Sequence, residues 1–283
     1  MSVSLVESSH IVVPVLVPER SFRNDLRAIK IVWHRDIIRF WRDKPRIVAS
    51  LIQPILYLFV LGSGLSSMIP AGRGVPLRTF LFPGVISMSV LFTCFFSAGS
   101  LVWDREFGFM REMLVAPVRR GAIVAGKCLG GATAGVLQGA LLIAIGGLVG
   151  IPYDPVLIAT LLAELLLLSF ALTAFGVLVA VRIKGMQSFM AIMQMLLMPL
   201  FFLSGALFPL NGLPGWLTVL TRLDPLTYAV DPMRRAVFER LAIPTAGVTW
   251  GGAAVPVPVE LGIVAAMSIV ALTVATAQFS KAD

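Results

Sequence analysis

Long stretches without charged residues dominate the hydrophobic pattern of this chain. Residues 47–72, 79–103 and 128–153 contain no Asp, Glu, Lys or Arg, and each exceeds the ~20 apolar residues that cross ~30 Å of hydrocarbon. Residues 156–181 contain a single charged residue, Glu164. Because a helix satisfies its own backbone hydrogen bonds in lipid, these stretches predict an all-α integral membrane protein with six spans. The expected spans cover about residues 47–69, 79–103, 123–150, 156–181, 188–210 and 258–279.

The residues outside the spans predict shorter helices. Six apolar residues recur at helical spacing ahead of the first span: Phe22, Leu26, Ile29, Trp33, Ile37 and Phe40. We expect residues 22–46 to form an amphipathic elbow helix on the membrane surface, either as an anchor in the headgroups or as a contact for a cytosolic partner. Residues 1–21 are expected to be a flexible cytosolic tail. Pro and Gly punctuate residues 211–257, which predicts short re-entrant or outer helices before the last span.

The composition agrees with a membrane protein and indicates its orientation. Hydrophobic residues make up 58% of the chain and charged residues 13%, against roughly a quarter charged in soluble domains. Of the 23 Lys and Arg, 17 fall in the tail, in the loops after the second and fourth spans, and after the last span. The positive-inside rule makes this side cytosolic and places both termini there. The basic excess therefore indicates topology, and nucleic-acid binding is disfavoured.

The sequence offers little catalytic or metal-binding chemistry. His10 and His34 lack metal-ligand spacing, and Cys94 and Cys128 lie in different apolar stretches, as is typical of small core residues. Residues 121–128 nearly match a phosphate-binding loop. However, Cys128 replaces the Ser or Thr of that motif, no strand precedes it, and a membrane span follows. We therefore expect no ATPase site, metal or cofactor in this chain.

The loop at residues 104–122 combines charged and apolar side chains. Its candidate docking residues are Arg105, Glu106, Phe107, Phe109, Met110, Arg111 and Glu112. A merely solvated loop has no need of exposed aromatic and Met side chains, which are favoured at protein interfaces. We therefore favour a partner protein bound by this loop over a helix that lies flat on the lipid.

Three further features lie inside the predicted spans. Gly131, Gly135 and Gly139 recur four apart and predict a ridge that another helix approaches closely, which supports pairing of two copies. Span five is rich in Met and Phe, which either face lipid and core or line an adaptable apolar cavity. Gln138 and Glu164 reach a similar depth, which predicts a hydrogen bond between them. The alternative is that Glu164 is a counter-charge for a cationic substrate.

Three motifs follow one another along the chain: Phe82-Pro-Gly-Val, then Asp104-Arg-Glu-Phe-Gly with Leu114-Val-Ala-Pro, and Leu213-Pro followed by Asp224-Pro-Leu-Thr-Tyr and Arg234. In this order and spacing the chain resembles the membrane subunits of ATP-binding-cassette exporters in the type-2 permease family. That family includes drug-resistance, nodulation-factor and polysaccharide export permeases. The resemblance extends from Phe22 to the sixth span. Asp224 departs from the pattern, which often has Asn before this Pro.

The resemblance implies the permease subunit of an exporter in the cell inner membrane, which is not itself an enzyme. Two copies would pair within the lipid, and each would dock, through loop 104–122, a separate ATPase subunit that holds ATP and Mg. The substrate path would run between the copies along spans two and five. Its implied residues are Phe92, Phe95, Phe96, Met195, Met198 and Phe202.

The substrate and the transport class leave alternatives. The Met and Phe of span five favour a hydrophobic drug or lipid-like substrate, and a polysaccharide or glycolipid is the alternative within the family. An ion-coupled secondary transporter is the rival from another class. Such coupling usually needs ionisable groups at depth, whereas deep in the bilayer this chain offers only Glu164, and it shows no inverted repeat.

Overall fold

Six helices of the computed structural model are long and apolar enough to cross a membrane, which confirms the expected all-helical, six-span architecture. They are Lys44–Gly64, Leu77–Glu106, Arg120–Val149, Pro155–Ala180, Met186–Leu203 and Val257–Phe279. The structure describes residues 21–66, 77–109, 113, 118–210, 212–243, 247–250 and 253–281. Within these residues the only strands are β1 (Thr249–Trp250) and β2 (Ala253–Ala254), which pair antiparallel.

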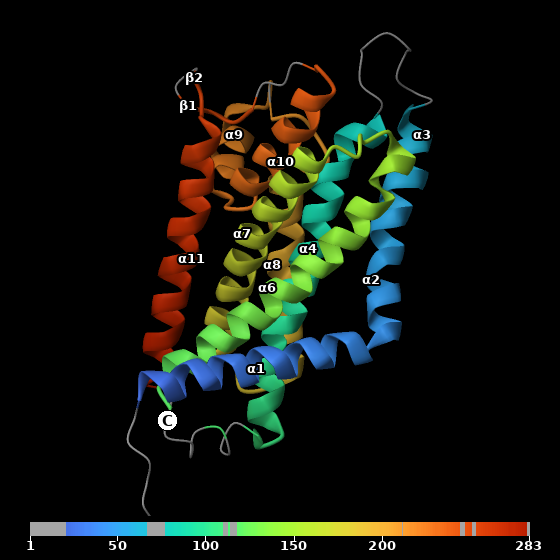
Figure 1. Ribbon diagram of the computed structural model, residues 1–283. Helices are drawn as coiled ribbons and strands as arrows, with labels where there is room; N and C mark the ends of the chain where they lie inside the picture. Colours follow the sequence, from blue (N-terminus) through green and yellow to red (C-terminus); the bar gives the residue numbers. More distant parts are fainter. Residues whose placement is uncertain are drawn as a thin grey trace, which may run out of the picture.

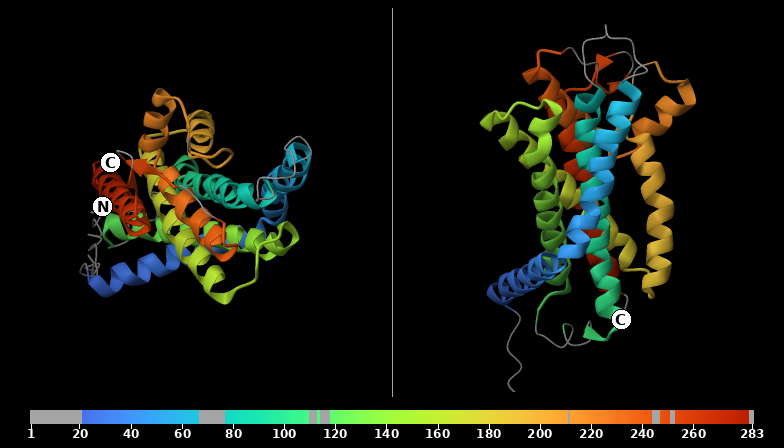
Figure 2. Two further views of the ribbon diagram at one scale, coloured as in Figure 1. Left: turned by 90° about the horizontal axis from the view of Figure 1, so that it is seen from above. Right: turned by 90° about the vertical axis from the view of Figure 1, so that its right-hand side faces the viewer.

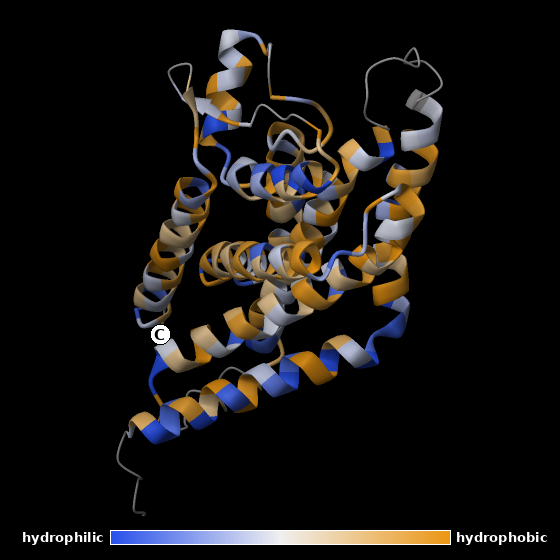
Figure 3. Cartoon of the chain, turned by 45° about the horizontal axis from the view of Figure 1, so that its top comes forward, coloured by the Kyte–Doolittle hydropathy of each residue, from blue (hydrophilic) through white to orange (hydrophobic). Residues whose placement is uncertain are grey.

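The first helix, α1 (Phe22–Arg42), lies across one end of the bundle, which we call the elbow end (Figure 1). Hydrophilic and hydrophobic residues alternate along it, whereas the spans are mostly hydrophobic (Figure 3). It ends at Arg42, earlier than the expected residue 46, because the side chain of the next residue, Asp43, accepts a hydrogen bond from the Arg46 amide and so caps the next helix.

The first span is built from three consecutive helical segments. These are α2 (Lys44–Leu56), a π-helical turn η1 (Tyr57–Leu61) and α3 (Gly62–Ser66). Proline in the first turn of α2 favours a helix start at this position, since its missing N–H is not needed there. Within the apolar stretch of 18 residues that defines this span, only 17% is buried within the chain, so most of its surface faces outward.

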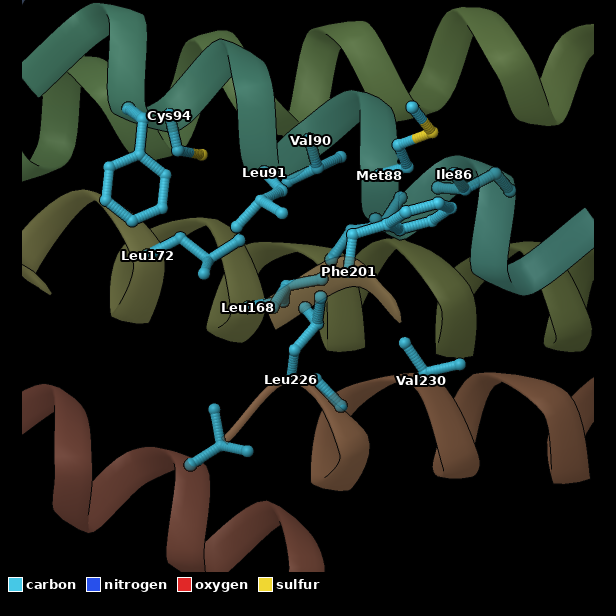
Figure 4. Packing of buried hydrophobic residues seen from close by; sticks show 14 of the residues in the cluster. Ile86, Met88, Val90, Leu91, Cys94, Leu168, Leu172, Phe201, Leu226 and Val230 are labelled. Atoms are coloured by element: carbon cyan, nitrogen blue, oxygen red, sulfur yellow. The ribbon is translucent and has the colours of Figure 1, made fainter. Parts of the chain in front are cut away.

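The centre of the bundle is α4 (Leu77–Glu106). Of the apolar stretch of 18 residues that defines this span, 83% is buried. Helix α4 packs against α6 (Arg120–Ile145) and α7 (Pro155–Ala180), and α6 continues into the short 3-10 helix η2 (Gly146–Val149). Figure 4 shows this core from close by, with Met88 of α4, Leu168 of α7 and Val230 of α10 (Thr227–Arg240) among its side chains.

The glycine ridge of α6 serves contacts inside one chain. A Cβ at Gly135 would come within 2.6 Å of Ser169 Oγ on α7 and 2.7 Å of Cys94 Sγ on α4. Gly131 and Gly139 likewise face side chains of α4 and α7. The ridge lets these three helices approach closely. It therefore gives no support to pairing of two copies, contrary to the sequence interpretation.

The opposite end of the bundle carries α9 (Gly215–Leu223) and α10, which lie between α8 (Met186–Leu203) and α11 (Val257–Phe279) in the chain (Figure 1). Helix α8 ends at Leu203, short of the expected residue 210, because the chain turns at Gly205 with a positive φ of 69°. Arg234 Nη2 holds this turn by donating to the Gly205 carbonyl at 2.6 Å.

Candidate functional site

A cavity of about 540 Å³ lies between α2, α4 and α8. Helices α2 and α8 stand beside α4, and each leaves most of its surface outside the core (Figure 2). Four of the six expected path residues line this cavity: Phe92, Phe95 and Phe96 from α4 and Met198 from α8. Its wall is mainly apolar, and among the described residues Arg46 is the one charged residue that lines it.

The other two expected path residues lie elsewhere on α8. Met195 has 76% of its surface exposed and Phe202 about half, and neither lines the cavity. The Met and Phe residues of α8 therefore divide between two faces. One face, with Met193 and Met198, borders the cavity, and the other points away from the chain.

A second cavity of about 430 Å³ adjoins the first at the elbow end. Two guanidinium groups stand over aromatic rings in its wall. Arg39 lies 5.5 Å from the centre of the Trp103 ring, and Arg46 lies 4.9 Å from the centre of the Phe96 ring. In a cation–π pair of this kind, the guanidinium charge is attracted to the face of the aromatic ring. The sequence interpretation treated both arginines only as topology signals.

A buried ion cluster beside this cavity joins α1, α4 and α6. Lys127 is 1% exposed, and its Nζ lies 2.8 Å from Asp104 Oδ2 and 3.1 Å from Asp36 Oδ1. Lys127 also donates to Ser100 Oγ at 2.8 Å, and Arg35 pairs with Asp104 at 2.5 Å. The cluster balances two cations against two carboxylates, so each buried charge is compensated.

Sequence reasoning missed this cluster because it assigned Lys127 to the charged flank of a span. The signal was present in α1, whose buried residues are Asp25, Val32 and Asp36. These residues share one helical face, and it is this partly acidic face that packs on α6. Two residues of the predicted apolar stripe, Phe22 and Leu26, are 71% and 51% exposed, whereas the other four are half-buried.

The predicted docking loop begins with two exposed aromatic side chains. Phe107 is 64% exposed and Phe109 is 54% exposed. Met110, Arg111 and Glu112 lie outside the described residues.

Arg105 and Glu106 have partners within the chain that the sequence interpretation did not foresee. Arg105 Nη1 donates to the carbonyls of Val181 and Ile183 at 3.0 Å, and Glu106 Oε2 accepts from the Met186 amide at 3.1 Å. These two residues therefore tie the end of α4 to the link between α7 and α8.

The predicted hydrogen bond between Gln138 and Glu164 is wrong. Gln138 Nε2 donates to Ser89 Oγ of α4 at 3.2 Å. Glu164 is buried, and its Oε2 has no hydrogen-bond partner among the described residues. Its charge lies close enough to that of Glu260 on α11 for the two to repel. Equal depth of two residues in adjacent helices does not ensure that their side chains meet.

Buried polar groups also occupy the end opposite the elbow. Arg235 of α10 pairs with Asp231 at 2.6 Å and with Glu260 at 3.1 Å. Asp224, between α9 and α10, accepts from the Leu226 amide through Oδ1, while its Oδ2 has no partner in the described residues. Burial raises the pKa of Asp224 to about 7.

The amino-acid sequence is similar to those of transport permeases. The sequence profile of the ABC-2 type transporter family matches residues 27–238. The chain is 29% identical to the inner membrane transport permease YadH of Escherichia coli K12 over 73% of this chain and 81% of that protein. It is 27% identical to nodulation protein J of Sinorhizobium fredii, over 74% and 80% respectively. It is also 27% identical to the putative transport permease ycf38 of Cyanophora paradoxa, over 74% and 73%.

Proposed function

The chain belongs to the ABC-2 type transporter family, and on that premise we propose that two copies of it form the export path for a hydrophobic drug or lipid-like substrate. It is a multi-pass transmembrane subunit, and the described residues hold no ATPase domain. ABC-2 permeases pair with ABC ATPase subunits, so ATP and Mg are expected on a partner chain rather than on this one.

The observation that carries the substrate proposal is the apolar cavity between α2, α4 and α8. It is about 540 Å³ in volume, which is within the range of sites for drug-sized molecules. Aromatic and Met side chains dominate its wall, and Met side chains adapt to ligands of different shapes. Two of its three helices keep most of their surface outside the core, which leaves them free to meet a second copy.

The partner proposal concerns the loop after α4. Exposed Phe107 and Phe109 extend beyond the bundle at the elbow end, where aromatic anchors are suited to a protein groove. We place this end in the cytosol on the strength of the positive-inside rule, with both termini on that side and the protein in a cell inner membrane. The name of the Escherichia coli relative, an inner membrane transport permease, supports that location.

The decisive experiment reconstitutes the purified permease and its ATPase subunit in proteoliposomes. We expect ATP-dependent movement of a fluorescent hydrophobic dye or an NBD-labelled phospholipid across the bilayer. The control is an ATPase subunit that binds but does not hydrolyse ATP. Equal transport with both ATPase subunits would contradict an ATP-driven exporter, and no transport of either probe would contradict the hydrophobic substrate class.

A further inference from the structure

We propose that the transported molecule carries an anionic headgroup, which Arg39 and Arg46 bind at the elbow end of the cavity. This inference rests on the proposed export function and narrows its substrate class. The two cavities are continuous, neither arginine forms an ion pair with a described carboxylate, and no described acidic residue lines the apolar cavity.

The two cavities form one continuous path. They share six lining residues: Phe40, Arg46, Ile47, Thr93, Phe96 and Met190. The elbow-end cavity is bordered by charged residues of α1, and the cavity above it is bordered by apolar residues of α4 and α8. A molecule that spans both therefore meets charge at one end and hydrocarbon-like surface at the other.

Arg39 and Arg46 have unused hydrogen-bonding capacity. Neither forms an ion pair with a described carboxylate, and neither guanidinium donates a side-chain hydrogen bond to a described residue. The Arg46 guanidinium is attracted by the Asp43 carboxylate and, to a lesser extent, repelled by the Arg39 guanidinium. The guanidinium carbons lie over the Trp103 and Phe96 rings, and the N–H groups of both arginines stay available for an oxyanion.

Two carboxylates, Asp36 and Asp43, also line the elbow-end cavity, and Asp36 Oδ2 has no hydrogen-bond partner among the described residues. Asp36 and Asp104 pair with Lys127 and Arg35 in the buried cluster. Asp43 caps α2 by accepting from the Arg46 amide. An anion placed between the two guanidinium groups would relieve their repulsion, and this is the charge complementarity that selects a phosphate or carboxylate headgroup.

The apolar cavity disfavours a cationic substrate. No Asp or Glu is among the residues that line it, and Glu164 lies elsewhere, near α11. Apart from Arg46, the polar residues that line it are neutral, such as Ser50, Gln53 and Gln194. The predicted ligand is therefore an anionic amphiphile whose head sits at Arg39 and Arg46 and whose apolar body extends along α4 and α8.

A binding experiment with matched probes tests this assignment. Three dansyl-labelled dodecyl probes differ only in the head: phosphate, hydroxyl and trimethylammonium. Binding to the purified permease in phosphatidylcholine nanodiscs is followed by tryptophan-to-dansyl energy transfer. We expect the phosphate probe to bind about tenfold more tightly than the other two, the order of effect of a charge-assisted hydrogen bond that is partly exposed.

Substitution of the arginines supplies the control. Arg39→Gln and Arg46→Gln should each reduce the ratio of phosphate to hydroxyl affinity severalfold. Arg42→Gln should leave the ratio unchanged, because Arg42 is an exposed charge on the same helix that lines neither cavity. Because the readout is a ratio, a variant with an altered cavity still reports on headgroup recognition.

Three results would overturn the inference: equal affinity for the three heads, an equal effect of all three substitutions, or displacement of the phosphate probe by inorganic phosphate. The last would mean that the site takes a free anion. No ATPase is present in this assay. A permease that prefers the phosphate probe but exports nothing would therefore contradict the proposed function alone. Export of neutral dyes without any headgroup preference would contradict this inference alone.

Discussion

Glu106 at the end of α4 accepts a hydrogen bond from the backbone amide of Met186, the first residue of α8. A carboxylate at a helix N-terminus satisfies a free N–H group and interacts favourably with the helix dipole. The helix that it caps lines the apolar cavity. The loop expected to bind the ATPase is therefore joined directly to a wall of the substrate path.

The first prediction concerns this link. Glu106→Lys removes the acceptor and places a cation at the N-terminus of α8, which should destabilise its first turn by about 0.5–1 kcal/mol. We expect the ATPase subunit to co-purify normally while substrate-stimulated ATP hydrolysis falls. Glu106→Gln is the matched control, since its amide oxygen still accepts the bond. Loss of co-purification in Glu106→Lys alone would show that Glu106 contacts the ATPase itself.

The second prediction separates docking from lipid contact at the exposed aromatic residues. Phe107→Ala combined with Phe109→Ala should weaken co-purification of the ATPase subunit about tenfold or more, because buried aromatic anchors dominate interface energies. Trp216→Ala, which changes an exposed aromatic residue on α9 at the opposite end, is the control. If the double variant retained the ATPase at the wild-type level, the loop would lie on lipid rather than on a protein.

The third prediction tests the buried ion cluster. Lys127→Met leaves Asp36 and Asp104 without their shared buried cation, and removal of one partner from a buried pair typically costs ~3–5 kcal/mol. We expect a clear drop in the thermal unfolding midpoint of the purified permease. Lys184→Met, at an exposed position, should leave the midpoint unchanged. Equal midpoints for the two variants would mean that the cluster contributes little to stability.

The fourth prediction is a pH dependence that originates at Asp224. Burial raises its pKa to about 7 from the usual 3.8, so the folded state binds this proton more tightly than the unfolded state does. Stability should therefore decrease as pH rises from about 4 to about 7, by roughly 2 kcal/mol between pH 5 and pH 8.

The matched variant for this prediction is Asp224→Asn, which keeps the acceptor for the Leu226 amide and removes the charge. Thermal unfolding of the wild type and the variant between pH 5 and pH 8 isolates the contribution of Asp224. We expect the difference between them to be largest at pH 8, with the variant more stable. A difference that does not change with pH would contradict the assignment.

The fifth prediction addresses pairing of two copies. Both cysteines, Cys94 and Cys128, are buried, so a cysteine introduced on the surface is the accessible one. Met195→Cys, on the outward face of α8, should cross-link two copies in native membranes. Ile269→Cys is an equally lipid-accessible control on α11, where we expect no cross-link. Cross-links at Ile269 but not at Met195 would place the contact between copies on the other side of the bundle.

The sequence predicted the six spans because each is a long stretch with few charges, and that property depends only on the local chain. Four of the residues that the family resemblance placed along the path, Phe92, Phe95, Phe96 and Met198, line one cavity, and their place on the path stays a prediction. The sequence did not predict the partners of Lys127, Arg105 or Glu106. Helical periodicity shows which residues share a face, but it does not show which neighbouring helix that face meets.

The failed Gln138–Glu164 pair has the same origin. Rise per residue gives the height of a side chain in the bilayer, but the direction in which it points depends on how the helices are rotated against one another. Gln138 donates to Ser89 on α4, whereas Glu164 Oε2 has no hydrogen-bond partner among the described residues. The rotation of each helix about its axis is seen only in the packed structure.

The two helices that meet at Asp43 are held very unequally. Helix α1 is held against α6 by the ion pair of Asp36 with Lys127. By contrast, only 17% of the apolar 18-residue stretch that defines the first span is buried. Asp43 therefore joins a helix that is fixed to the core, α1, to a span that few contacts within the chain restrain. The first span forms one side of the apolar cavity. We therefore expect it to pivot at Asp43, which changes the cavity volume open to a substrate while the core around α4 stays intact.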